Sequence, residues 1–187
     1  MRELKFIHIT KCAGTTIEDL GKDHGKRWGR YHKEYGWWHE IFSKKSQNLK
    51  DKYDWFMVVR NPYDRILSEY YCKWGGKGKK DDHTKEDFNL FLINKINRRS
   101  QKGHHYTEQY KYLDKNCKIN IIKFENLDKE FNNLMSSYKI NLELNKHSNK
   151  SSEKKFTVSD FSPKLIRLIN KVYEKDFKHF GYSMNMI

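Results

Sequence analysis

Residues 6–19 read FIHITKCAGTTIED, and this stretch decides the expected fold. It overlaps a dense apolar run, LKFIHI (4–9), and the loop TKCAG (10–14) leads from that run into a helical pattern near Thr15. DWFMVVR (54–60) and INIIKF (119–124) repeat the arrangement of an apolar run followed by a helical pattern. Such runs are typical of parallel strands covered on both faces, so the alternation predicts an α/β fold with a mostly parallel sheet.

The helical patterns are defined by spacing and by end signals. After the second apolar run, residues at helical spacing share one face: Tyr63, Ile66, Leu67, Tyr70, Tyr71 and Trp74, with Pro62 suited to the first helical position. Further helices are expected at 85–96, with Thr84 as N-cap, and at 126–138. A last helix is expected to be capped by Ser162, to open at Pro163 and to stop at Gly181. Residues 75–83 and 145–155 read as irregular segments, and no domain boundary stands out, so residues 1–187 are expected to form one domain.

The composition favours an anionic partner. Lys and Arg number 38 against 24 Asp and Glu, which gives a net charge of +14. Nucleic acid, a phosphorylated cofactor, an anionic glycan or an acidic membrane suits this charge, and so does a lysine-rich solvated surface. Cys12, Cys72 and Cys117 lie far apart with no CxxC pair, so neither a disulfide framework nor a metal site is expected. Reduced thiols, no signal peptide and no apolar run of about 20 residues together predict a cytoplasmic protein without a membrane span.

The loop between the first strand and its helix has the features of an anion site. Ligands of open α/β sheets bind at the carboxyl ends of the strands, and the N–H groups at a helix N-terminus attract anions. Gly14 lets the backbone come close, Thr15 and Thr16 offer hydroxyl groups, and Lys11 adds a positive charge. The loop is not a Walker A motif, because that motif places its lysine after the last glycine.

A second segment, VVRNPYDRILSEYY (58–71), places charged and hydroxyl groups at the end of the second strand. Arg60 leaves the strand where a ligand is expected, and Ser68 lies on the following helix, away from most of its apolar stripe. An arginine and a serine can together hold a phosphate, the arginine as a two-pronged donor. Arg65 is as well suited to an ion pair with an acidic neighbour as to ligand contact.

The two segments KCAGTT (11–16) and RNPYDRILSEYY (60–71), in this order and each after a strand, resemble the sulfotransferases that use 3′-phosphoadenosine-5′-phosphosulfate (PAPS). The carbohydrate branch, which includes the uronyl 2-O-sulfotransferases, is the most similar. Three later segments extend the resemblance over nearly the whole chain: HYTEQYKYL (105–113), IIKFENL (121–127) and VYEKDFKHFGY (172–182). The resemblance implies a P-loop-like three-layer α/β domain whose central sheet is flanked by helices.

The resemblance also implies roles for particular residues. The first loop, with Lys11, Cys12, Ala13, Gly14, Thr15 and Thr16, would hold the 5′-phosphosulfate, and Lys11 would stabilise the charge on the leaving phosphate. Arg60 and Ser68 would hold the 3′-phosphate, and Asn149, Lys150 and Ser151 resemble a late loop that closes over the nucleotide. Cys12–Ala13 stand where Thr–Gly is common, and Glu108 stands where proline is usual, which puts the loop geometry in question.

The general base is expected to be a histidine, since imidazole suits proton transfer near neutral pH, and the candidates are His32, His39, His104 and His105. His39 matches the base of the uronyl branch best, because it lies 21 positions before Arg60. His105 is the second candidate and is otherwise expected to orient the acceptor, while His8 is expected to be structural. Glu40 is a further candidate to orient His39 or to act as the base.

The acceptor would carry a hydroxyl group, on a glycan or a small molecule, and neither a nucleic acid nor a metal is expected. Trp37 and Trp38 flank His39 and could stack on a sugar, although core packing is the more common fate of tryptophan. Three other readings of the sequence stay open. The first is a nucleotide kinase-like phosphotransferase that uses ATP and Mg²⁺, and the second is a non-catalytic module that binds polyanions. The third is a degenerate sulfotransferase fold that only binds its ligands. The sequence does not address the oligomeric state.

Overall fold

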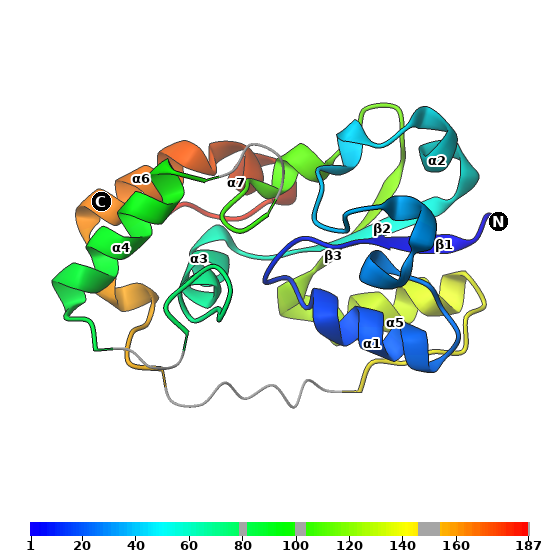
Figure 1. Ribbon diagram of the computed structural model, residues 1–187, viewed down its shortest axis with the longest axis horizontal. Helices are drawn as coiled ribbons and strands as arrows, with labels where there is room; N and C mark the ends of the chain where they lie inside the picture. The colour runs from blue at the N-terminus through cyan, green and yellow to red at the C-terminus, as the bar shows by residue number, and fades with distance from the viewer. Residues whose placement is uncertain (79–81, 100–103, 146–153, 187) are drawn as a thin grey trace. The chain divides into compact units, whose positions relative to one another are not determined.

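The computed structural model describes residues 1–78, 82–99, 104–145 and 154–186, and the chain falls into two compact units (Figure 1). The first unit comprises residues Met1–Arg60 and Lys111–Lys150, and the second comprises Asn61–Tyr110 and Ser151–Ile187. The proposed contacts Asn149, Lys150 and Ser151 lie outside the described residues. The expectation of one domain stays a prediction.

The first unit contains a three-stranded parallel sheet in the order β1 (Leu4–Ile7), β2 (Asp54–Val59) and β3 (Ile119–Lys123). Leu4 is in register with Asp54, and Trp55 is in register with Ile119. Both strand pairs are parallel, so all three carboxyl ends point the same way. The expected α/β fold with a parallel sheet flanked by helices is therefore confirmed.

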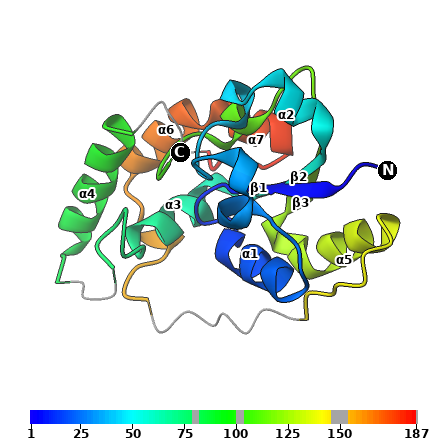
Figure 2. The same cartoon turned by 45° about the vertical axis from the view of Figure 1, so that its right-hand side comes forward.

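Helices cover both faces of this sheet. Helices α1 (Gly14–Asp23) and α5 (Leu127–Ser137) lie on one face and α2 (Gln47–Lys52) on the other, as Figures 1 and 2 show. Neighbouring residues of β2 point to opposite faces, as the pleat of a strand requires. Phe56 contacts the rings of Trp28 and Phe131, whereas Trp55 contacts Phe42.

The second unit is helical. Its helices are α3 (Pro62–Tyr70), α4 (Lys85–Asn97), α6 (Pro163–Val172) and α7 (Glu174–Phe180). Their apolar faces form one buried cluster, whose members include Tyr70, Phe88, Leu92, Leu165 and Phe177. The expected N-caps are confirmed: Thr84 forms a capping box with Asp87, and Ser162 accepts from the N–H of Leu165.

Several element ends differ from the sequence predictions. The first strand ends at Ile7 rather than at residue 9, and α3 ends at Tyr70, which leaves Trp74 81% exposed. The last helix is divided at Tyr173, whose buried hydroxyl donates to the Tyr106 carbonyl and whose backbone leaves the helical region. The short helix α2 has no counterpart among the predicted elements.

Six 3₁₀ turns complete the described structure: Gly29–Tyr31, Lys33–Tyr35, Phe42–Lys44, Gln109–Tyr112, Phe124–Asn126 and Val158–Asp160. In the part of the chain that the structure describes, none of the helices combines the length and the apolar character needed to cross a membrane.

Candidate anion-binding and active site

The loop after β1, residues 10–14, is called the anion loop below, and it has an unusual backbone. Lys11 and Ala13 have φ angles of 60° and 59°, in the left-handed region that residues with a Cβ seldom adopt. Cys12 between them is fully buried, so only its backbone can face a ligand. Strained loop residues of this kind are frequent at ligand-binding sites, where they aim successive N–H groups at an anion.

The N-terminus of α1 follows this loop directly. Ala13 is the N-cap residue and offers no side-chain acceptor to the first turn, which also contains no acidic residue. The first-turn N–H groups of a helix and the positive end of its dipole attract anions, and at α1 neither a side-chain cap nor an acidic first-turn residue opposes this attraction. Within the described residues, the Lys11 ammonium makes no hydrogen bond or ion pair, and Thr15 in the first turn of α1 is exposed.

His8 packs directly beneath the loop. Its Nδ1 lies 2.7 Å from Oε1 of Glu18, a carboxylate that is fully buried inside α1. The backbone N–H of Arg30 donates to the same oxygen at 2.8 Å. A Cβ on residue 14 would collide with the His8 ring, so Gly14 has a packing role besides the expected approach to a ligand. The histidine expected to be structural is thus paired with a buried acid next to the anion loop.

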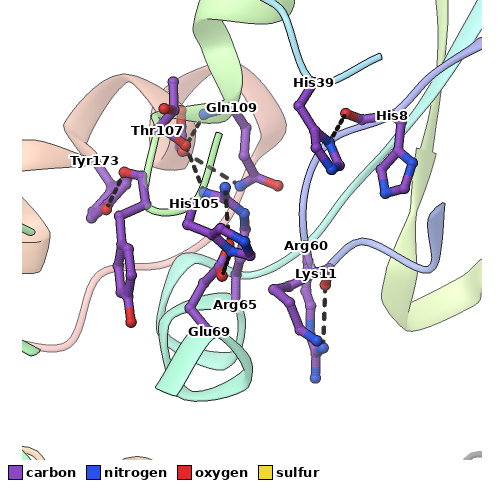
Figure 3. A network of polar contacts seen from close by, with 12 residues as sticks. His8, Lys11, His39, Arg60, Arg65, Glu69, His105, Thr107, Gln109 and Tyr173 are labelled. Atoms are coloured by element: carbon purple, nitrogen blue, oxygen red, sulfur yellow. Dashed lines mark hydrogen bonds and ion pairs between the residues drawn. The ribbon is translucent and has the colours of Figure 1, made fainter. Parts of the chain in front are cut away.

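The Arg60 side chain, at the end of β2, contacts residues that follow both β1 and β3. Its Nη1 lies 3.5 Å from the carbonyl oxygen of Lys11, the contact drawn in Figure 3. Its guanidinium carbon lies 4.1 Å from the centre of the Phe124 ring, just after β3. The two residues expected to contact phosphates at the ends of β1 and β2 are therefore brought together, as the parallel sheet predicts.

His39 lies at the same edge of the sheet. Its ring centre is 4.5 Å from that of His8, and its Nδ1 is 3.4 Å from the His8 carbonyl oxygen (Figure 3). The hydroxyl of Tyr112 donates to the His39 carbonyl at 2.9 Å, which fixes the backbone at this position. A carbonyl oxygen can only accept, so the contact favours the tautomer with the proton on Nδ1 and the lone pair on Nε2.

The buried Lys45 side chain contacts residues on both sides of His39. The Lys45 ammonium lies 2.5 Å from the carboxylate of Glu40 and donates to the carbonyl of Trp37 at 3.3 Å. Glu40 is therefore paired with Lys45, and its expected role beside His39 stays a prediction. Trp37 is 42% exposed and Trp38 is half-buried, and their ring centres lie 6.2 and 5.1 Å from that of His39.

The remaining site predictions fall in the second unit. Ser68 is half-buried on α3, and Arg65 is buried, 3.7 Å from Glu69 and bonded to the Thr107 carbonyl at 2.8 Å. The ion pair expected as one reading of Arg65 is present. The Nδ1 of His105 lies 2.5 Å from Oε2 of Glu69 (Figure 3).

Sequence reasoning missed the partners of two histidines. Glu18 lies on the inner side of α1 and Glu69 on the inner side of α3, and both carboxylates are fully buried. Each charge has a compensating neighbour, which is the usual condition for burying a carboxylate. A glutamate among apolar helical positions was the available signal, but the spacing alone could not show which histidine it meets.

Comparison with known proteins places the chain in a family. A model of sulfotransferase family 2, described as "Sulfotransferase family", matches residues 2–183, nearly the whole chain. The chain belongs to the sulfotransferase family. No curated protein matches this sulfotransferase, and neither does any solved structure. Family membership supports an enzyme that transfers a sulfuryl group to an acceptor hydroxyl, on an α/β fold consistent with the P-loop-like one expected.

Proposed function

We propose that this sulfotransferase takes its sulfuryl group from PAPS and delivers it to a hydroxyl group of a carbohydrate. The observation that carries the proposal is the loop between β1 and α1. Its left-handed residues Lys11 and Ala13, its uncapped helix N-terminus and its unpaired lysine fit a 5′-phosphosulfate. PAPS would supply the activated sulfuryl group, bonded to a phosphate that leaves.

The residues of the loop would stabilise the leaving phosphate. In the transfer, a bond forms between the acceptor oxygen and sulfur while the bond between sulfur and the phosphate oxygen breaks, so negative charge grows on that phosphate. The Lys11 ammonium and the N–H groups of Gly14, Thr15 and Thr16 would meet this charge. Positioning and charge stabilisation dominate catalysis of the related phosphoryl transfer, and the same demands apply here.

His39 would take the proton of the acceptor hydroxyl. With Nδ1 facing the His8 carbonyl, the lone pair of Nε2 would accept the proton, and the imidazolium would form beside a ring that is paired with Glu18. The exposed ring of Trp37 supports a sugar acceptor, because sugars stack on indole faces. The likeness of residues 60–71 to the family's phosphate segment supports Arg60 and Ser68 as the residues that would hold the 3′-phosphate of the donor.

The donor assignment is tested by calorimetric titration with the product nucleotide, 3′-phosphoadenosine-5′-phosphate. We expect wild type to bind it at least tenfold more tightly than 5′-AMP or ATP–Mg²⁺, since each charge-assisted hydrogen bond contributes about 1.5–3 kcal/mol. Ser68→Ala should weaken this binding, whereas the exposed Ser159→Ala should not. Equal binding of 5′-AMP would refute the donor assignment, and preference for ATP–Mg²⁺ would favour the kinase-like reading.

The acceptor assignment needs a turnover assay. Release of 3′-phosphoadenosine-5′-phosphate from PAPS would be followed with a panel of uronic acid-containing polysaccharides, simple sugars and phenols. We expect turnover with a polysaccharide, lost in His39→Ala while nucleotide binding is retained, and kept in the exposed control His179→Ala. Nucleotide binding without turnover on any acceptor would favour the non-catalytic reading.

A further inference from the structure

Three side chains of the second unit with metal-binding donor atoms gather near the end of α3. A donor atom each from Glu69, Cys72 and His105 lies within 4.8 Å of the other two. Glu69 is fully buried, Cys72 is 8% exposed and the His105 side chain is 13% exposed. The cluster contains a thiol, an imidazole and a carboxylate, which is a different donor set from that of the anion loop.

The backbone after α3 brings these groups together. The N–H of Cys72 donates to the Glu69 carbonyl at 3.0 Å, which tightens the last turn of the helix. The chain then folds back, and the N–H of Gly76 donates to the Cys72 carbonyl at 2.9 Å. A Cβ on Gly75 would collide with the His105 ring, so the glycine lets the ring lie against this turn. The three groups are therefore held by the fold rather than by long flexible side chains.

The surroundings orient the carboxylate. Arg65 lies 3.7 Å from Oε1 of Glu69 and is itself fixed by a hydrogen bond of 2.8 Å to the Thr107 carbonyl. Oε2 is left to face His105, at 2.5 Å from its Nδ1 (Figure 3). A carboxylate with one oxygen held by a second partner and the other aimed at the cluster is the usual arrangement around a bound metal.

We propose that Glu69, Cys72 and His105 bind one zinc ion. Zinc accepts sulfur, nitrogen and oxygen ligands together, prefers four-coordinate geometry and often completes three protein ligands with water. Binding replaces the proton shared between His105 and Glu69 and removes the proton of the Cys72 thiol, so protons are released to solvent. The ion would fix the His105 ring at the end of α3. The proposal does not depend on the identity of the sulfuryl donor.

The test is zinc binding by the full chain. The purified protein is stripped with a chelator and titrated with zinc chloride against a chromophoric competitor. We expect one zinc ion per chain, with affinity reduced at least tenfold in Cys72→Ser and in His105→Asn. The matched controls Cys117→Ser and His179→Asn remove a thiol and an imidazole elsewhere and should bind as wild type does.

A cobalt spectrum of the wild-type protein tests the same site without relying on a variant that fails to fold. Cobalt at the same site should give wild type a thiolate-to-metal charge-transfer band, which Cys117→Ser retains. Wild type without stoichiometric zinc or without this band would overturn the proposal and leave a hydrogen-bonded His105–Glu69 pair. Folded variants that bind zinc as wild type does would show adventitious binding and overturn it equally.

Discussion

At the scale of single residues, Ala13 and Gly14 in the anion loop have different structural roles. Ala13 adopts a φ of 59°, a left-handed conformation in which its Cβ crowds the backbone. Gly14 has no such backbone demand, but its missing Cβ leaves room for the His8 ring. Ala13 is therefore held in a conformation that glycine would adopt at lower cost.

Replacing Ala13 by glycine should stabilise the protein. The left-handed conformation disfavours alanine by about 1–2 kcal/mol, so we expect Ala13→Gly to raise the free energy of unfolding by roughly 1 kcal/mol in urea titrations. Lys139→Gly, at a φ of 54°, should have the same sign, whereas Ser136→Gly inside α5 should destabilise. A loss of stability in Ala13→Gly would contradict the strained backbone.

The packing of His8 against Gly14 predicts a coupling between the two residues. Gly14→Ala should destabilise the protein by about 1–3 kcal/mol because its Cβ meets the ring. The same change in a His8→Ala background should have a much smaller effect, since the space is vacated. A double-mutant cycle by chemical denaturation measures this coupling, and additive effects of the two changes would show that the ring does not occupy the space.

At the scale of elements, the strong local patterns were predictable. The three strands, the N-caps Thr84 and Ser162 and the opening of α3 at Pro62 follow from residue type and spacing. The helix ends that the sequence predicted wrongly depend on contacts between residues that are distant in sequence. The stripe towards Trp74 continues beyond Tyr70, but the chain folds back over the helix end through Gly75 and Gly76. The break at Tyr173 accompanies a hydrogen bond to Tyr106, which no local pattern contains.

The carboxylate of Asp176 on α7 makes stability pH-dependent. It accepts from the backbone N–H groups of Gln109 and Tyr110, yet burial raises its pKa from 3.8 to about 6. Between these values the folded protein binds more protons than the unfolded chain. This group therefore contributes stability at low pH that is lost as the pH rises through about 6.

The corresponding measurement compares wild type with Asp176→Asn at several pH values. Relative to the variant, wild type should gain on the order of 3 kcal/mol of unfolding free energy between pH 7 and pH 4. Asp23→Asn, an exposed change on α1, should show no such relative gain. A relative loss on acidification would mean that the two backbone donors outweigh the desolvation of the carboxylate.

At the scale of the whole molecule, the sequence predicted which strand ends meet but not the contacts that the loops add to them. The strand-end residues Lys11 and Arg60 meet because parallel strands end at one edge, which strand order alone can predict. The contact of His39 with His8 depends on the path of the intervening loop, which Lys45 and Tyr112 hold in place. Such polar contacts between distant segments have no periodic signal in the sequence.

The net charge of +14 alone does not distinguish an enzyme from a polyanion-binding module. If surface charge alone attracted anions, removal of a positive side chain would weaken all anionic ligands alike, and the attraction would fall with salt. In a specific donor site, by contrast, each phosphate of the donor contacts its own set of residues. Ligands that carry only one of the two phosphates therefore separate the two accounts.

The decisive measurement is a crossed calorimetric titration of Lys11→Ala and Arg60→Ala with 3′-AMP, 5′-AMP and 3′-phosphoadenosine-5′-phosphate. We predict that Lys11→Ala weakens the two ligands with a 5′-phosphate, and that Arg60→Ala weakens the two with a 3′-phosphate by about ten- to a hundredfold. Arg167→Ala, exposed on α6, serves as the charge-matched control. Equal weakening of all three ligands by both variants, or by the control, would contradict a sulfuryl-donor site in this loop.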